Sequence, residues 1–306
     1  MNHSGILVLD KPDGPTSHDC VDKLRRLFRT RRIGHAGTLD PFATGILVML
    51  VGKATRLAQF FNEDEKSYEA LVNWGNATDT GDRTGQVISS TNDPLPSQTQ
   101  IEDALAGMVG TIDQIPPMYS AIKIDGKPLY KMARKGKTVE RKAKTIHIRE
   151  FRLLKRSSSD FQIFVTCSKG TYIRTLAEDL GRKLGGFSHL KELRRIASGP
   201  FRIEEAHKYD DLVEAAKVDG TNENLARFLV PMNQALQNFP PLRADDQCAI
   251  RIINGRQPLV SELSGGQVTP DSIVRIIDSG DELLAMGAVD AGGEKVKLIR
   301  VLRNLP

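Results

Sequence analysis

Apolar residues recur along this 306-residue chain with two different periods. The apolar runs at 6–9 and 46–51 have the length of buried strands. Segments 68–74 and 161–165 place an apolar residue at every second position, which predicts strands with one face against a core. Short β segments are also expected at 272–277, 282–286 and 296–302. These patterns predict a substantial β content.

Helical spacing is found between several of these strands. Thr16 and Ser17 are hydroxyl residues suited to capping a helix whose apolar face includes Val21 and Leu24. Thr99 and Glu102 form a capping-box pattern for a second, shorter helix. The same spacing predicts further helices over 54–61, 173–180 and 189–196, and a mainly helical region with breaks over 206–236.

The order of these elements predicts a mixed α and β fold in two parts. Pro240 and Pro241 disfavour the continuation of a helix or a strand, so the chain is expected to divide there. Residues 1–240 are expected to form the large domain. Residues 241–306 are shorter, rich in β segments and separated by glycine turns, as in a compact barrel.

Composition narrows the class of protein. Hydrophobic residues make up 40% and charged residues 26%, as in ordinary globular proteins. No apolar run approaches the ~20 residues that span a bilayer, and the first run is too short for a signal peptide, so a cytoplasmic protein is expected. The net charge of +5 permits a polyanionic partner. The cysteines lie far apart without a CxxC pair, which favours reduced thiols: Cys20, Cys167 and Cys248.

The densest chemical signal lies around Asp40. Between Gly34 and Gly45, three glycines and a proline surround this one acidic residue. Pro41 biases Asp40 away from helical geometry, and glycines allow a ligand to approach the backbone closely. The residues alone leave two interpretations open: a carboxylate presented for chemistry, or an Asp-Pro turn that bonds only within its own loop.

Four ordered motifs carry a resemblance to a known family. Residues 34–45 read GHAGTLDPFATG, and residues 11–17, 78–82 and 167–174 read KPDGPTS, TDTGD and CSKGTYIR. Together with LRR at 193–195 they resemble the TruB-type tRNA pseudouridine synthases from about residue 5 to 200. The resemblance implies an α+β catalytic domain over 1–240 with a large mixed, mainly antiparallel sheet. It also implies an RNA-contacting insertion at about 83–149 and a PUA-like RNA-binding barrel over 241–306.

By this resemblance, Asp40 is the covalent nucleophile that lets uracil detach, rotate and rejoin the ribose through C5. Attack on C1′ of the sugar or C6 of the base is left open, and we favour C1′. Arg174 is expected to pair with Asp40 and favour its ionised form. Without the resemblance, Arg174 would be read as a surface helix residue beside Glu178.

Further substrate contacts follow from the same resemblance. Tyr68 is expected to stack on the flipped base and to act in proton transfer, and Leu193 to provide an apolar wall. His35 is expected to take the place of an extruded base in the RNA loop. The remaining motif residues expected to contact substrate are Lys11, Asp82 and Tyr172. Core packing is the alternative for Tyr68 and Leu193.

A basic run within the insertion is typical of a solvated surface, and in this family it fits a flap over RNA. Its residues are Lys131, Arg134, Lys135, Lys137, Arg141, Lys142 and Lys144, with Glu140 opposing them. No phosphate-binding loop, dinucleotide motif or metal-ligand spacing occurs in the expected setting, so no cofactor or metal is expected.

The resemblance therefore implies a stand-alone enzyme that converts uridine 55 in the tRNA T loop to pseudouridine. Its expected partner is tRNA, through the T-arm stem-loop, with no membrane and no obligatory protein partner. Two alternatives remain open: a guide-RNA-dependent enzyme acting on ribosomal RNA, and a non-catalytic protein that binds or folds tRNA.

Overall fold

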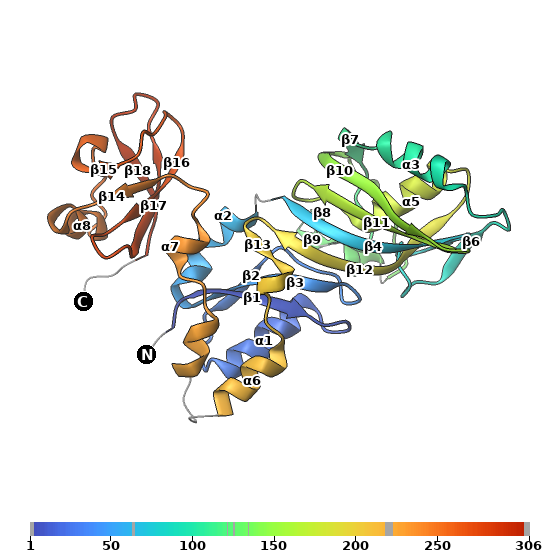
Figure 1. Ribbon diagram of the computed structural model, residues 1–306, viewed down its shortest axis with the longest axis horizontal. Coiled ribbons are helices and arrows are strands. Elements are labelled where there is room, and N and C mark those ends of the chain that lie inside the picture. The colour runs from blue at the N-terminus through green and yellow to red at the C-terminus, as the bar shows by residue number, and fades with distance from the viewer. Residues whose placement is uncertain are drawn as a thin grey trace.

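A nine-stranded sheet organises the larger part of the molecule (Figure 1). The computed structural model describes residues 3–62, 65–120, 122–124, 126–133, 135–217 and 223–302. The main path of the sheet is, in order, β1 (Gly5–Lys11), β3 (Thr44–Val51), β12 (Ser188–Ser198), β4 (Lys66–Trp74), β11 (Asp160–Cys167), β10 (Lys144–Arg156) and β7 (Gly110–Gln114). Two short strands, β2 (Ile33–Ala36) and β13 (Phe201–Arg202), pair with β3 and β12. β12 runs parallel to β3, and the other pairings on this path are antiparallel. The expected mixed, mainly antiparallel sheet is confirmed.

Helices cover different parts of this sheet. α1 (Ser17–Leu27) and α6 (Tyr209–Lys217) pack on the β1 and β3 end, and α3 (Gln98–Ala106) and α5 (Ile173–Lys183) on the β4 and β11 end (Figure 1). Of the two predicted capping residues, Thr16 caps α1, with Asp19 completing a capping box. β3 is buried on both faces because its alternate side chains enter two different clusters. The sheet therefore has a separate apolar cluster on each face of β3.

The predicted helix over 189–196 is wrong, because these residues lie in β12. Leu190 and Leu193 are three apart, which is helical spacing, yet both enter the core on one face of the sheet. A shift in the pairing with β4 between Leu190 and Glu192 inserts one extra residue. A bulge of this kind lets positions i and i+3 share a face of a strand, so the pattern resembled a helix.

Other boundaries differ by a few residues. α3 is capped by Ser97 with Gln100, not by Thr99 with Glu102. The segment predicted as one helix at 54–61 begins as the 3-10 helix η1 (Gly52–Leu57) and continues as α2 (Ala58–Asn62). Downstream, β8 (Lys123–Ile124) pairs with β9 (Lys127–Pro128). α4 (Leu129–Ala133) follows, and β5 (Asn76–Thr78) pairs with β6 (Val87–Ser90).

A second, five-stranded sheet begins at Pro241. Its order is β15 (Ser264–Gly265), β14 (Pro241–Arg243), β16 (Ile273–Ile277), β17 (Leu283–Val289) and β18 (Val296–Val301). The three β segments predicted near the end of the chain are confirmed, while α8 (Asp246–Ile253) was not predicted. The helical region before it contains α6, η3 (Glu223–Phe228) and α7 (Met232–Ala235). The division of the chain into two domains stays a prediction.

The two sheets are joined by a shared apolar cluster. Leu283 and Met286 of β17 belong to the same buried group as Phe60 and Phe61 of α2. Phe60 also meets Phe239 edge to face, with ring centroids 5.8 Å apart. Across the described part of the chain, no helix combines the length and the apolar character needed to cross a membrane.

Gly45 is required where β3 passes β12. Its φ of +95° is a conformation that side chains other than glycine rarely adopt. A Cβ at this position would lie 2.2 Å from the carbonyl oxygen of Arg195, the residue that Gly45 faces in the parallel pairing. β3, which follows the Asp40 loop, can therefore approach β12 this closely only because position 45 is a glycine.

Replacing Gly45 with alanine should lower the free energy of unfolding by more than ~1 kcal/mol, because both the backbone conformation and the available space are incompatible with a side chain. Thermal or urea unfolding measures the change. Gly34→Ala is the matched control, since a Cβ at Gly34 would have only the Thr55 Cγ2 as neighbour, at 4.0 Å. Equal stability of the two variants would contradict this prediction.

Candidate functional site

Asp40 lies in the loop between β2 and β3, and two side chains hold this loop from either side. The Ser17 hydroxyl accepts from the Leu39 N–H at 2.9 Å and donates to the Leu39 carbonyl at 3.1 Å. Lys11 Nζ donates to the carbonyls of Pro12, Pro41 and Ala43 at 2.9, 2.9 and 2.7 Å. Burial lowers the pKa of Lys11. The backbone is thus fixed on both sides of Asp40.

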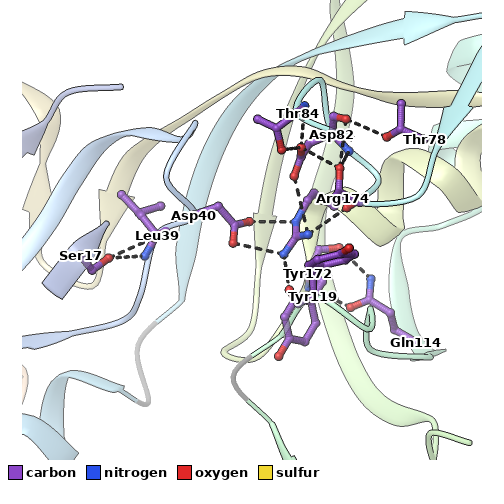
Figure 2. A network of polar contacts seen from close by, with 11 residues as sticks. Ser17, Leu39, Asp40, Thr78, Asp82, Thr84, Gln114, Tyr119, Tyr172 and Arg174 are labelled. Carbon is purple, nitrogen blue, oxygen red and sulfur yellow. Dashed lines mark hydrogen bonds and ion pairs between the residues drawn. The ribbon is translucent and has the colours of Figure 1, made fainter. Parts of the chain in front are cut away.

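The carboxylate of Asp40 faces the guanidinium of Arg174, the second residue of α5 (Figure 2). Arg174 Nε lies 2.9 Å from Asp40 Oδ2, and Arg174 Nη2 donates to Oδ1 at 3.1 Å. The side chain of Arg174 is 5% exposed, whereas that of Asp40 is 34% exposed. One side of the carboxylate is therefore fixed by a two-point contact, and part of it stays accessible.

The remaining donors of Arg174 bind the segments around it. Nη1 donates to the Thr80 carbonyl at 2.9 Å, and Nη2 donates to the Tyr119 carbonyl at 2.8 Å. The predicted residue Asp82 lies behind the guanidinium, with Oδ2 3.7 Å from Arg174 Nη1. Its other oxygen accepts from the Thr84 N–H at 2.9 Å and from the hydroxyls of Thr80 and Thr84 at 2.9 and 2.5 Å. Asp82 thus organises the turn between β5 and β6.

Gln114 fixes the start of the helix that carries Arg174. Its side-chain amide donates to the Tyr172 carbonyl at 3.0 Å, and its oxygen accepts from the Tyr172 N–H at 2.8 Å (Figure 2). Tyr172 is the N-cap residue of α5 and has no side-chain cap of its own. This pair of bonds therefore joins the end of β7 to the first turn of α5.

An apolar wall lies beside the loop. Tyr68 of β4 and Leu193 of β12 are buried in the same cluster as Leu39 and Phe42, which flank Asp40. Burial raises the pKa of the Tyr68 hydroxyl, and the Arg195 guanidinium opposes that shift. Tyr68 is therefore neutral at physiological pH.

Arg195 is, after Lys11, a second deeply buried cation near the loop, with 1% of its surface exposed. Its Nε donates to the Ile46 carbonyl at 2.6 Å and its Nη2 to the Gly37 carbonyl at 2.9 Å. It therefore ties both ends of the Asp40 loop to β12. Neighbouring Arg194 pairs with Asp10 at 2.8 Å and also donates to the Thr44 hydroxyl at 3.4 Å.

Burial and charge act in opposite directions on Asp40. Burial raises the pKa of Asp40 above its usual value, and the Asp82 carboxylate adds to the increase. The Arg174 guanidinium lowers the pKa of Asp40 through its charge and hydrogen bonds. The ionised form therefore depends on Arg174 more than it would for an exposed carboxylate.

The structure brings together Asp40, Arg174, Tyr68, Leu193 and Asp82. Tyr172 lies beside Arg174 (Figure 2), where burial raises the pKa of its hydroxyl. The substrate contacts expected for these residues stay predictions, as does the one for Lys11, whose ammonium is occupied by three loop carbonyls.

His35 is placed differently from this group. It lies on β2, opposite Met49 of β3, and is half-buried. Burial lowers its pKa, with Arg195 and His18 adding to the decrease. Its Nδ1 is buried without a hydrogen-bond partner in the described part of the chain. The predicted insertion of His35 into RNA stays a prediction.

Sequence reasoning missed three residues that position the loop or the arginine: Ser17, Gln114 and Arg195. Ser17 and Arg195 lie inside quoted motifs, so their motif membership was the available signal. Gln114 lies in no such motif, and only the fold brings it to Tyr172. Within the described residues, no group of three or more His, Cys, Asp or Glu side chains could hold a metal ion.

Two protein-family models match this chain. Residues 25–173 match the model of the TruB family pseudouridylate synthase N-terminal domain. Residues 174–237 match that of the tRNA pseudouridylate synthase B C-terminal domain. The chain belongs to the TruB family of pseudouridylate synthases. The family recognised from the four motifs is confirmed.

Relatives in the TruB family extend over nearly the whole chain. A tRNA pseudouridine synthase B of Bacillus thuringiensis (strain Al Hakam) is 43% identical over 289 residues, covering 92% of this chain and 91% of that protein. One from Burkholderia mallei (strain NCTC 10247) is 42% identical over 292 residues, covering 94% of each. Identity at this level supports an enzyme of the pseudouridine synthase class.

Two solved structures have a similar fold over nearly the whole chain. A chain of a Cbf5-Nop10-Gar1 complex is 28% identical with a TM-score of 0.77, and the match covers 98% of this chain and 85% of that one. A chain of the archaeal box H/ACA sRNP Nop10-Cbf5 complex is 25% identical with a TM-score of 0.76, covering 99% of this chain and 87% of that one. The likeness includes the residues of the second sheet.

Removing the charge of Arg174 should raise the pKa of Asp40 further. In Arg174→Gln the opposing effect of the guanidinium is absent, so the carboxyl should titrate at higher pH than in the wild type. Carbon-13 NMR of labelled aspartate follows the titration. Arg174→Lys keeps a positive charge and should give the smaller shift. An unchanged or lower midpoint in Arg174→Gln would show that the arginine does not govern this ionisation.

Proposed function

We propose that this protein isomerises uridine to pseudouridine at position 55 in the T loop of tRNA. The observation that carries the proposal is the two-point contact between Asp40 and Arg174, with a third of the Asp40 side chain exposed. The membership of the chain in the TruB family, and the relatives named tRNA pseudouridine synthase B, support the choice of tRNA.

In this proposal Asp40 attacks the flipped nucleoside as a carboxylate. With attack at C1′, an ester forms between Asp40 and the sugar as the bond from C1′ to N1 of uracil breaks. After the base rotates, C5 bonds to C1′, the ester breaks, C5 loses its proton and N1 gains one. The loop contacts of Ser17 and Lys11 fix the backbone on both sides of Asp40, which lowers the cost of reaching the reacting geometry.

The apolar wall is suited to the detached base. Tyr68 would stack on it and provide a neutral hydroxyl for proton transfer, while Leu193 would exclude water. An intermediate with a free uracil needs such exclusion, because water would otherwise compete for C1′. His35 would occupy the space that the flipped nucleotide leaves in the loop.

The insertion provides the cations for a flap over the RNA. Most of its described basic side chains are exposed: Lys131, Lys135, Lys137, Lys142 and Lys144. Arg134 lies outside the described residues, and Arg141 donates to the Pro116 carbonyl at 3.0 Å. The Tyr119 carbonyl, in the same insertion, binds Arg174. A flap attached there would close beside the reacting carboxylate.

The proposal also covers the domain boundaries, the cellular location and the partners of the protein. Residues 1–240 are the catalytic domain, and residues 241–306 form a PUA-like barrel that contacts tRNA outside the target loop. The enzyme acts in the cytoplasm without an obligatory protein partner, metal or cofactor.

Bare tRNA distinguishes the proposed function from two others, a guide-dependent enzyme and a protein that only binds or folds tRNA. The likeness to a structure of an H/ACA RNP bound to a substrate RNA, at a TM-score of 0.77, favours a guide-dependent enzyme as the second candidate. Such an enzyme would leave bare tRNA unmodified. A protein that only binds or folds tRNA would bind the transcript without changing it.

The decisive measurement is tritium release from an unmodified tRNA transcript labelled at C5 of uridine, with the purified protein alone. Asp40→Asn should reduce the rate at least ~10³-fold, because removal of a covalent nucleophile has effects of this size or larger. Asp22→Asn removes an exposed carboxylate of α1 and is the control, with an unchanged rate expected. Release by Asp40→Asn at the wild-type rate would exclude Asp40 as the nucleophile.

Binding tests the flap. Lys135, Lys137 and Lys142 are replaced with glutamine. The slope of the logarithm of the tRNA association constant against the logarithm of salt concentration should become shallower by about 0.7–0.9 for each phosphate that the protein no longer neutralises. Filter binding at a series of salt concentrations gives the slope. The control replaces Lys155, Arg182 and Lys183, exposed cations of β10 and α5. The same slope in both triple variants would rule out the flap contact.

A further inference from the structure

A second strongly basic surface lies outside the catalytic loop, at the end of α1 and the turn into β2. Six cations and no acid occur between residues 23 and 32: Lys23, Arg25, Arg26, Arg29, Arg31 and Arg32. The half-buried Arg25 is neutralised by Asp22 at 3.0 Å, and Lys23 lies over the ring of Tyr209. These contacts account for only part of the cluster.

Three arginines of this surface are exposed: Arg29, Arg31 and Arg32. Their side chains make no hydrogen bond or ion pair with the described residues. Surface arginines commonly contact a nearby carboxylate or carbonyl, as Arg25 does here. We call these three residues the α1–β2 arginines.

Arg29 also occupies a backbone position that disfavours it. Its φ is 49°, in the left-handed region, directly after the C-cap residue Phe28. The turn is closed by the Thr30 N–H, which donates to the Arg25 carbonyl at 3.1 Å. Glycine is the usual residue at this position of a helix end, because other side chains are strained there. An arginine here therefore costs stability, which indicates that its side chain serves another purpose.

The α1–β2 arginines lie close in sequence to the catalytic loop and next to a segment that contacts the second sheet. Arg32 precedes Asp40 by only eight positions in the chain, so the two lie at most ~29 Å apart. The Arg32 carbonyl accepts from the Gly52 N–H at 2.8 Å, which places it beside η1. From η1, Arg56 Nη1 donates to the Val301 carbonyl of β18 at 3.1 Å. Figure 1 shows α2 between the large sheet and the second sheet.

We propose that the α1–β2 arginines bind phosphates of tRNA away from the target nucleotide. The inference rests on the proposed action on tRNA. A guanidinium presents a planar fork that matches phosphate oxygens, and unpartnered exposed arginines keep that fork free. Phosphates recur every ~3.4 Å along one strand of a duplex, so an RNA with its uridine at Asp40 carries phosphates as far as this surface.

The test compares Arg29→Gln/Arg31→Gln/Arg32→Gln with the wild type on an unmodified tRNA transcript. The dissociation constant should rise, and the salt slope should flatten by about 0.7–0.9 for each phosphate that is left without its arginine. The rate at saturating tRNA should stay unchanged, because these residues do not touch the reacting atoms. The triple variant of Lys155, Arg182 and Lys183 is the charge-matched control and should bind as the wild type does.

A second variant separates binding from folding. Arg29→Gly should raise the melting temperature, because glycine removes the backbone strain, and should weaken tRNA binding. A purely structural residue would not shift these two quantities in opposite directions. Wild-type affinity and salt slope in the triple variant would overturn the proposal and leave another anionic partner for this surface. If the wild-type protein released no tritium, isomerisation would fail, while the binding measurements would still decide the role of these arginines.

Discussion

The contact between Asp40 and Arg174 is the interaction on which the geometry of the site depends. It joins a loop of the β2–β3 hairpin to the first turn of α5, 134 residues later in the chain. Each partner is fixed separately: Ser17 and Lys11 hold the loop, and Gln114 holds the start of the helix. A carboxylate that is partly buried would tend to take up a proton, and the neighbouring guanidinium opposes that tendency. The ion pair thus holds the loop against α5 and also favours the ionised form of Asp40.

Much of the fold could be predicted from the sequence, because period-two and helical spacing coincide with β4, β11, α1 and α5. The prediction failed at β12, where a bulge gives a strand the apolar spacing of a helix. Pairing across the sheet is not encoded in local spacing, so the central position of β12 between β3 and β4 could not be predicted.

The candidate site shows the same limit. Asp40 by itself was compatible with a simple turn, and only the ordered motifs pointed to Arg174 as its partner. The structure places the two in contact, yet the support from Gln114 depends on β7 ending beside α5, a relation between distant segments. Residues that support a site through the backbone of a neighbour carry little local signal. Motifs therefore indicate which residues meet, and the fold shows what holds them.

Most of the hydrogen-bonding capacity of Arg174 is used within the protein. A guanidinium has five N–H donors. Four of them bind Asp40, Thr80 and Tyr119, while the Asp82 carboxylate lies 3.7 Å from Nη1, beyond hydrogen-bond distance. A pyrimidine brought to Asp40 would find both donors that face this carboxylate already engaged. Discrimination between uracil and cytosine is then expected to come from other groups around Asp40.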